Sequence, residues 1–193
     1  WGGARGGGGS GPTAREWLLT GSGVAEQYHM RWFEQHLPAD GSVRIEALGL
    51  KLTGFSLAGP KARDVLARVV REDVSNAAFP FMAVRRMDVG MAPAVVGRVS
   101  YTGDLGYELF VPAEKALGLW DRLMVAGVPR GIRAIGYTAL NRARLEAGLI
   151  VANADFTTSE HAIRADRTRM PDEIGLGFMV DPEKGNFNGR RAI

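Results

Sequence analysis

The sequence predicts an α+β fold of antiparallel sheets with packed helices. Apolar segments typical of strands follow one another directly at several places in the chain, which favours antiparallel pairing. Segments with one apolar helical face recur between them, without the strict alternation of strand and helix that a parallel sheet needs. The 193 residues are enough for one large domain or two small ones with a buried core.

The composition excludes several kinds of site and partner. The sequence has no cysteine and three histidines, so it predicts neither disulfides nor a metal site. No run of about 18 apolar residues occurs, so no membrane span is expected. The net charge of +3 comes from 24 basic and 21 acidic residues that are evenly spread, which argues against nucleic acid as a partner.

The composition of the N-terminal part of the chain changes at residue 16, from glycine-rich to a pattern typical of regular structure. Residues 1–15 are rich in glycine and are predicted to be a flexible segment. Residues 16–20 have the pattern of a short strand. Residues 24–37 form a predicted helix, ended by Pro38, with its apolar residues on one face.

More strands and a short helix are predicted in the next part of the chain. Residues 43–48 alternate as a half-buried strand, and residues 52–58 form a second one. The pair Gly59-Pro60 opens a helix that extends to residue 70, because proline is favoured at the first helical position. Two further strands, at 82–89 and 94–101, lead into a hairpin.

This hairpin contains the stretch whose residue types are hardest to explain by folding alone, Ser100–Phe110. Two glycines and an aspartate precede the second strand and suit a tight turn. Side chains alternate between the faces of a strand, so Tyr107 and Glu108 are expected on opposite faces of the sheet. A carboxylate within an apolar strand is costly without a partner, so Glu108 is either solvated on an edge strand or part of a site.

Two helices and a charged segment are predicted in the C-terminal part. Pro112 starts a helix with a buried stripe that includes Leu119 and Leu123. A second helix lies within 132–148. Residues 155–170 have no apolar period and are predicted to be an exposed excursion.

The stretch S-Y-T-G-D-L-G-Y-E-L, which begins at Ser100, resembles the S-Y-T-G-E-x-G-Y-E-L segment of the glycine-cleavage T-protein family. This is a family of folate-dependent aminomethyltransferases, and the stretch is also similar to the C-terminal module of dimethylglycine and sarcosine dehydrogenases. Leu57–Leu66 resembles the family's L-x-G-P-x-A-x-x-V-L stretch. Leu140–Gly148, aligned on Arg144-Leu145-Glu146, and Lys184–Arg190 resemble its L-R-L-E-x-G and K-G-x-F-x-G-R segments, in the same order along the chain.

The resemblance implies tetrahydrofolate as the cofactor and Glu108 as the residue that binds its pterin ring. A carboxylate can accept two parallel hydrogen bonds from a ring N–H and an adjacent amino group. The resemblance also implies that Tyr101 and Tyr107 line or brace the pocket. Phe81 belongs to an F-P-F unit near the family's ligand channel, and the alternative for it is a core plug. Arg144 completes the candidate cofactor-binding residues, and the alternative for it is a structural ion pair with Glu146.

No catalytic residue is assigned. In the family a Gly-Gly pair precedes the catalytic aspartate, and Gly2-Gly3 matches that pair, but residues 4–11 contain no carboxylate. Leu140 stands where many aminomethyltransferases carry a folate-contacting arginine, which fits the dehydrogenase-associated and demethylase-like branches better.

The function that the resemblance implies is tetrahydrofolate-dependent transfer of an aminomethyl or methyl group from a small amine or ether donor. The alternative is a catalytically silent member that acts as a structural or assembly module. A nucleotide-binding domain is set aside because no G-x-G-x-x-G or P-loop follows a strand.

The expected partners are the small-molecule donor and either a flavin dehydrogenase domain or a lipoyl carrier protein. The expected location is the cytoplasm, or the mitochondrial matrix in a eukaryote. The expected organisation is a flexible segment at 1–15 and a folate-binding domain at 16–171. Residues 172–193 begin a connection to a C-terminal barrel that this chain lacks.

Overall fold

The computed structural model describes residues 2–6, 16–21, 25–159 and 161–192. The chain divides into two compact units, Trp1–Ala143 and Arg144–Ile193. The domain boundary expected between residues 171 and 172 stays a prediction.

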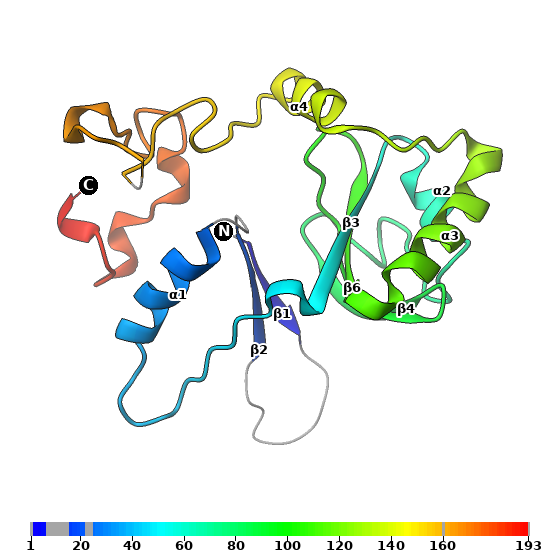
Figure 1. Cartoon of the computed structure of the whole chain (residues 1–193), viewed down its shortest axis with the longest axis horizontal. Helices are drawn as coiled ribbons and strands as arrows, with labels where there is room; N and C mark the ends of the chain where they lie inside the picture. The colour runs from blue at the N-terminus through cyan, green and yellow to red at the C-terminus, as the bar shows by residue number, and fades with distance from the viewer. Residues whose placement is uncertain (1, 7–15, 22–24, 160, 193) are drawn as a thin grey trace. The chain divides into compact units, whose positions relative to one another are not determined.

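The first unit contains a four-stranded antiparallel sheet (Figure 1). Its strands are β3 (Leu52–Ala58), β4 (Val84–Val89), β5 (Ala92–Gly97) and β6 (Gly106–Pro112), in the order β3-β6-β5-β4. All three pairings are antiparallel, which confirms the predicted α+β class.

Helices α2 (Ala62–Leu66) and α3 (Ala116–Gly127) cover one face of this sheet, as Figure 1 shows. Each strand gives every second side chain to that face, as strand geometry requires. The buried core so formed contains Leu57, Ala62, Val65, Leu66, Val74, Phe79, Met87, Val89, Ala92, Ala94, Val96, Tyr107, Leu109, Val111, Leu119 and Leu123. On this core face, Phe55 of β3 also lies against Trp120 of α3, with ring centroids 6.3 Å apart.

One predicted strand and the predicted tight turn differ from the structure. Residues 43–48 are not a strand, and Val43 is exposed, so this prediction is wrong. An alternating pattern makes a strand only where a neighbouring strand accepts its backbone hydrogen bonds, and the described residues provide none there. The connection from β5 to β6 is not a tight turn either, because residues 98–105 all lie between the two strands.

A second sheet pairs β1 (Gly2–Gly6) with β2 (Glu16–Thr20). The predicted flexible segment therefore differs from the structure at residues 2–6, where β2 supplies hydrogen-bond partners for an extended backbone. Residues 7–15, the remainder of that segment, lie outside the described residues. Helix α1 (Glu26–Gln35) confirms the predicted helix, but its apolar residue Trp32 remains exposed.

Helix α4 (Tyr137–Glu146) confirms the helix predicted within 132–148. Short 3-10 helices account for most of the remaining regular structure: Gly49–Lys51, Ala113–Lys115, Val128–Arg130, Ala165–Arg167, Gly177–Met179, Pro182–Lys184 and Arg190–Ala192. Across the part of the chain that the structure describes, no helix is both long and apolar enough to cross a membrane.

Candidate functional site

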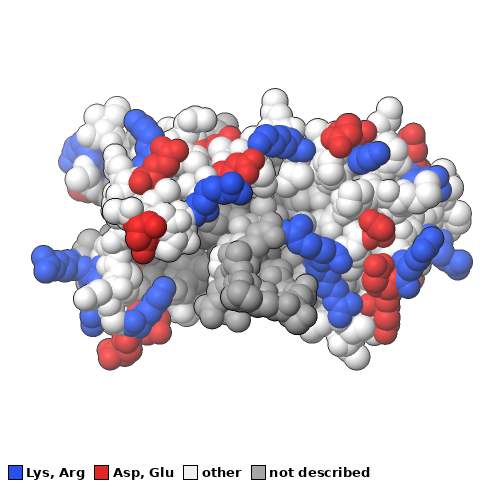
Figure 2. Space-filling model, turned by 90° about the horizontal axis from the view of Figure 1, so that it is seen from below, with Lys and Arg blue, Asp and Glu red and all other residues white. Residues whose placement is uncertain are grey.

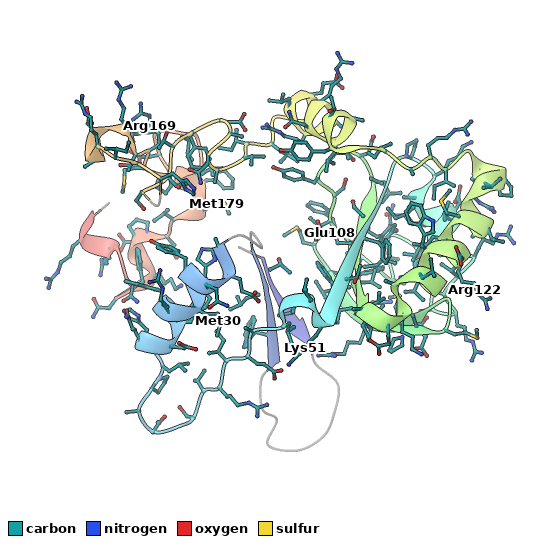
Figure 3. All side chains as sticks on the ribbon, in the orientation of Figure 1. Met30, Lys51, Glu108, Arg122, Arg169 and Met179 are labelled. Carbon is teal, nitrogen blue, oxygen red and sulfur yellow. The ribbon has the colours of Figure 1, made fainter. Side chains whose placement is uncertain are left out.

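Glu108 lies on the face of the main sheet opposite to α2 and α3. Its neighbours in β6, Tyr107 and Leu109, are fully buried in the core, whereas Glu108 is half-buried. Figure 3 shows Glu108 on the side of the sheet that faces away from α3. The predicted separation of Tyr107 and Glu108 onto opposite faces is therefore confirmed.

The residues around Glu108 on its own face are small. Ser56 of β3 is its partner on one side and Gly97 of β5 is its partner on the other. Gly106 precedes it by two positions, so it belongs to the same face. The larger neighbour, Phe110, lies close to Gly54, where a Cβ would be 3.3 Å from the ring. The two positions paired with Glu108 therefore carry no bulky side chain.

The electrostatic environment of Glu108 is unusual for a surface carboxylate. Burial raises the pKa of its carboxyl above the ordinary value, because desolvation disfavours the charged form. No basic side chain or hydrogen-bond donor among the described residues compensates this cost. A half-buried carboxylate without a partner is suited to accept hydrogen bonds from a ligand.

A pocket of about 300 Å³ lies at the end of the sheet where the chain passes from β5 to β6. It is lined by Phe81, Arg98, Val99, Ser100, Gly103, Asp104, Leu105 and Gly106. Gly106, which lines the pocket, is two positions before Glu108 on the same face of β6. Ser100 packs so closely on Gly106 that a Cβ there would lie 2.6 Å from the Cβ of Ser100. The loop after β5 therefore packs directly on the first residue of β6.

The predicted aromatic residues occupy three different environments. Phe81 is 70% exposed and lines the pocket. Tyr101 is half-buried in the loop between β5 and β6, beside the pocket residue Ser100. Tyr107 is fully buried and packs on Phe79 with ring centroids 5.8 Å apart. Phe79 is thus the core plug of the F-P-F unit, and Phe81 is its pocket residue.

Arg144 belongs to the second compact unit and is buried there. Its guanidinium forms an ion pair with Asp155 and donates a hydrogen bond to the carbonyl of Leu149. The expected partner Glu146 is instead exposed, so the predicted Arg144–Glu146 pair is corrected to Arg144–Asp155. The predicted partner is two positions from Arg144 in the sequence, whereas the fold of the following loop brings Asp155, 11 positions away, to the guanidinium.

Charges on the surface do not form a single-sign patch on the face shown in Figure 2, where basic and acidic side chains are interspersed. Among the described residues, no group of three or more His, Asp or Glu side chains is arranged to hold a metal ion.

Comparison with known proteins identifies the family. Residues 13–184 match the GCVT N-terminal domain. The chain belongs to this family. The resemblance to the glycine-cleavage T-protein superfamily is thereby confirmed, and the antiparallel sheet with packed helices is consistent with the GCVT N-terminal domain.

Individual relatives include dehydrogenases, oxidases and transferases. Mitochondrial dimethylglycine dehydrogenase of Homo sapiens is 33% identical over 178 residues, which cover 91% of this chain and 19% of that protein. Sarcosine oxidase subunit alpha of Rhizobium meliloti is 33% identical over 167 residues, 86% of this chain and 16% of that protein. An aminomethyltransferase of Chlorobaculum parvum is 37% identical over 163 residues, 83% of this chain and 41% of that protein. The chain thus spans about a fifth of the dimethylglycine dehydrogenases that it matches.

Sequence reasoning missed the pocket residues Arg98, Ser100 and Asp104. Ser100 and Asp104 lie inside the family-like stretch, so their position was a usable signal. No such sequence signal marked Arg98, because its hydrogen bond to the Phe79 carbonyl joins segments that are 19 positions apart.

Proposed function

We propose that this GCVT N-terminal domain binds tetrahydrofolate and takes part in the transfer of an aminomethyl or methyl group from a small amine or ether donor. The observation that carries the proposal is Glu108, a half-buried carboxylate without a partner among the described residues, at the position of the pterin-binding glutamate in the family-like stretch. The bound folate supplies the nitrogen atoms that accept the one-carbon unit.

The surroundings of Glu108 fit a pterin ring. Its carboxylate can accept two parallel hydrogen bonds. Burial in the sheet has removed part of the hydration of this carboxylate and raised its pKa, and a ligand that donates hydrogen bonds replaces the lost water contacts. Ser56 and Gly97, its partners in the neighbouring strands, place no bulky side chain of their own beside it. Phe81 and Tyr101 contribute aromatic surface at the adjacent pocket and loop.

The remaining candidate residues have supporting roles in this proposal. Tyr107 braces the site from the core side of β6, directly behind Glu108. Arg144 is already engaged by Asp155 and Leu149, so we assign it a structural role. The chain contributes orientation and binding to the transfer, and its proton-handling group is unassigned.

The donor and the protein partners follow from the same resemblance. We propose a small-molecule donor delivered by a flavin dehydrogenase domain or a lipoyl carrier protein, in the cytoplasm or the mitochondrial matrix. The names of the relatives, which include a dehydrogenase and an oxidase that act on N-methylated glycines, support the flavin-linked source.

The test is isothermal titration of the chain with tetrahydrofolate, alongside Glu108→Gln. The substitution keeps the shape of the side chain but removes the charge and one acceptor oxygen. We expect binding to weaken by roughly 1.5–3 kcal/mol, which is about tenfold or more. Glu114→Gln, an exposed glutamate shortly after β6, is the matched control and is expected to bind as the unmodified chain does.

Equal binding by Glu108→Gln and the unmodified chain would contradict the proposed site. Binding without one-carbon transfer, when a donor is added, would instead favour the catalytically silent module.

A further inference from the structure

One segment that resembles the family has no role in the proposed function, Lys184–Arg190. Its pattern K-G-x-F-x-G-R leaves the residue before the second glycine open, and this chain has Asn188 there, directly before Gly189. An asparagine in this position can react with its own main chain. The main-chain nitrogen of the glycine attacks the side-chain amide carbon, and a glycine has no Cβ to hinder the approach.

Asn188 and Gly189 are the two central residues of a turn. The turn is closed by a hydrogen bond of 3.2 Å from the Arg190 N–H to the Phe187 carbonyl. Gly189 has a φ of 93°, in the left-handed region that glycine favours. The turn therefore uses the glycine for its conformation and leaves the Gly189 N–H outside the hydrogen bond that closes it.

The fold leaves both reacting groups accessible. Asn188 and Gly189 are exposed, and a Cβ at Gly189 would meet nothing within 4 Å. Among the residues that the structure describes, neither the Gly189 N–H nor the Asn188 side-chain amide forms a hydrogen bond. The nitrogen can lose its proton to hydroxide without breaking a contact. Arg190 and Arg191 follow directly, and their positive charges stabilise the anion that forms.

Three other asparagines are held by the fold. Asn76 accepts a hydrogen bond of 2.6 Å from Nη2 of Arg63. Asn153 accepts hydrogen bonds from the N–H and the hydroxyl of Thr158. Asn141 lies inside helix α4, whose regular backbone engages the N–H of the following residue. These side chains are less free to meet a main-chain nitrogen than the side chain of Asn188.

Asn186 is the internal comparison within the same segment. It is exposed like Asn188, and it forms no hydrogen bond with its side chain among the described residues. It precedes Phe187, however, and a side chain on the attacking residue hinders the approach of the nitrogen. The two asparagines therefore differ chiefly in the residue that follows.

The sequence has one other pair that could form the same ring, Asp40-Gly41. Hydrogen bonds from Ser42, first from its side chain and next from its main chain, lower the pKa of the Asp40 carboxyl. An ionised carboxylate is a poor target for a nucleophile. The Gly41 N–H also donates a hydrogen bond of 3.4 Å to the Pro38 carbonyl. The neutral amide of Asn188 is therefore the more reactive of the two groups.

We propose that Asn188 is a site of spontaneous covalent modification, where the side-chain amide becomes a carboxylate through a succinimide ring. The deprotonated Gly189 nitrogen forms a bond to the side-chain carbonyl carbon of Asn188. The bond from that carbon to the amide nitrogen breaks, and this nitrogen takes up a proton and leaves as ammonia. One water molecule then opens the ring at either carbonyl, to give aspartate or isoaspartate. No oxidant or reductant takes part.

The modification changes the charge and the main chain of the segment. It adds one negative charge next to Arg190 and Arg191, so the net charge falls from +3 to +2. Opening of the ring at the main-chain carbonyl gives isoaspartate, which inserts one more carbon atom between Phe187 and Arg190. The hydrogen bond between these two residues then has to close a longer ring, and we expect the turn to be lost.

The experiment is incubation of the folded chain at several pH values, followed by trypsin digestion and mass spectrometry. Trypsin cleaves after Lys184 and Arg190, so one peptide contains both Asn186 and Asn188, and fragmentation distinguishes them. We expect Asn188 to be converted, with isoaspartate among the products. The rate should rise about tenfold per pH unit, because the deprotonated fraction of the Gly189 nitrogen does so. Asn186 should react about tenfold or more slowly than Asn188.

Two variants serve as matched controls. Asn188→Gln should lose the reaction, because its longer side chain would have to form a larger ring. Asn186→Gln should leave the reaction at Asn188 unchanged. Equal rates at Asn186 and Asn188 would overturn the proposal. Reaction of Asn188 only after unfolding in urea would also overturn it, because the native turn would then protect the side chain.

Hydrogen exchange of the Arg190 amide tests the effect on the turn. We expect faster exchange in the isoaspartyl form than in Asn188→Asp, which carries the same charge on an ordinary main chain. Equal exchange in these two forms would contradict the loss of the turn. None of these results depends on whether Glu108 binds folate, so this inference and the proposed function stand or fall separately.

Discussion

Gly97 lies directly opposite Glu108 in the register between β5 and β6, so the carboxylate has no side chain beside it on that strand. A Cβ at position 97 would meet Val99 and Val84 at 3.6 and 3.8 Å, which is ordinary van der Waals contact. The packing of the sheet therefore does not require glycine at position 97. The missing side chain matters instead for Glu108, which lies beside Gly97 on the same face.

The first prediction follows from this space. Gly97→Val adds a branched side chain next to Glu108, and we expect it to weaken tetrahydrofolate binding about tenfold or more, roughly 1.4 kcal/mol. The two methyl groups of valine extend beyond the Cβ toward Val99 and Val84, and the preference of valine for strands offsets part of this crowding, so we expect stability to fall by no more than about 1–3 kcal/mol. Isothermal titration and thermal unfolding of the same variant check both parts. Unchanged binding would show that the ligand does not occupy this face.

The second prediction concerns the pH dependence of stability. The pKa of Glu108 is raised above its ordinary value of 4.5 by desolvation, so the folded state binds the proton more tightly than the unfolded state does. Stability therefore falls as the pH rises from about the ordinary pKa through the raised one. Glu108→Gln should remove this loss, and so be more stable than the unmodified chain at neutral pH but not at pH 4.

Urea unfolding at a series of pH values measures this difference, with Glu114→Gln as the control for an exposed glutamate. A stability difference that does not vary with pH would rule out desolvation of Glu108 as its cause.

The third prediction concerns the buried hydroxyl of Tyr107. This hydroxyl has no hydrogen-bond partner among the described residues, although its side chain is fully buried. An unpaired buried polar group costs stability, so we expect Tyr107→Phe to stabilise the chain by about 1–2 kcal/mol. Tetrahydrofolate binding should not change, because the hydroxyl is on the core side of the sheet.

Thermal unfolding checks this, and Tyr137→Phe serves as the control because that tyrosine is 75% exposed. A loss of stability in Tyr107→Phe would mean that the hydroxyl is paired in solution.

The fourth prediction concerns Arg144 and Asp155. The hydrogen bond from Arg144, and next the one from the Val151 N–H, lower the pKa of the Asp155 carboxyl. The stability that the ionised carboxylate contributes is therefore present above the ordinary carboxyl pKa and is lost as the pH falls through the lowered one. Asp155→Asn should reduce the hydrogen-exchange protection of the Val151 amide at neutral pH, and this effect should shrink in acid.

Asp166→Asn is the control, because Asp166 pairs with Arg164 on the surface. If Asp155→Asn leaves the Val151 amide as protected as before at neutral pH, the pair does not hold this loop in place.

Local patterns predicted most of the secondary structure. Strands β2, β3 and β6 and helices α1, α3 and α4 were expected from periodicity, because alternation and helical spacing are properties of the nearest residues along the chain. Residues 43–48 show the limit of this reasoning: their alternation is as regular as that of β3, but the described residues place no strand beside them.

The sequence by itself determined that Glu108 and Tyr107 face opposite ways and that the Ser100–Leu109 stretch is that of the glycine-cleavage T-protein superfamily. The tertiary structure alone decided that Ser56 and Gly97 flank the carboxylate, that Arg98 lines a pocket beside it, and that Arg144 pairs with Asp155. The physical reason is that the direction of a side chain depends on its own strand. Its neighbours depend on how distant segments pair, which no local pattern encodes.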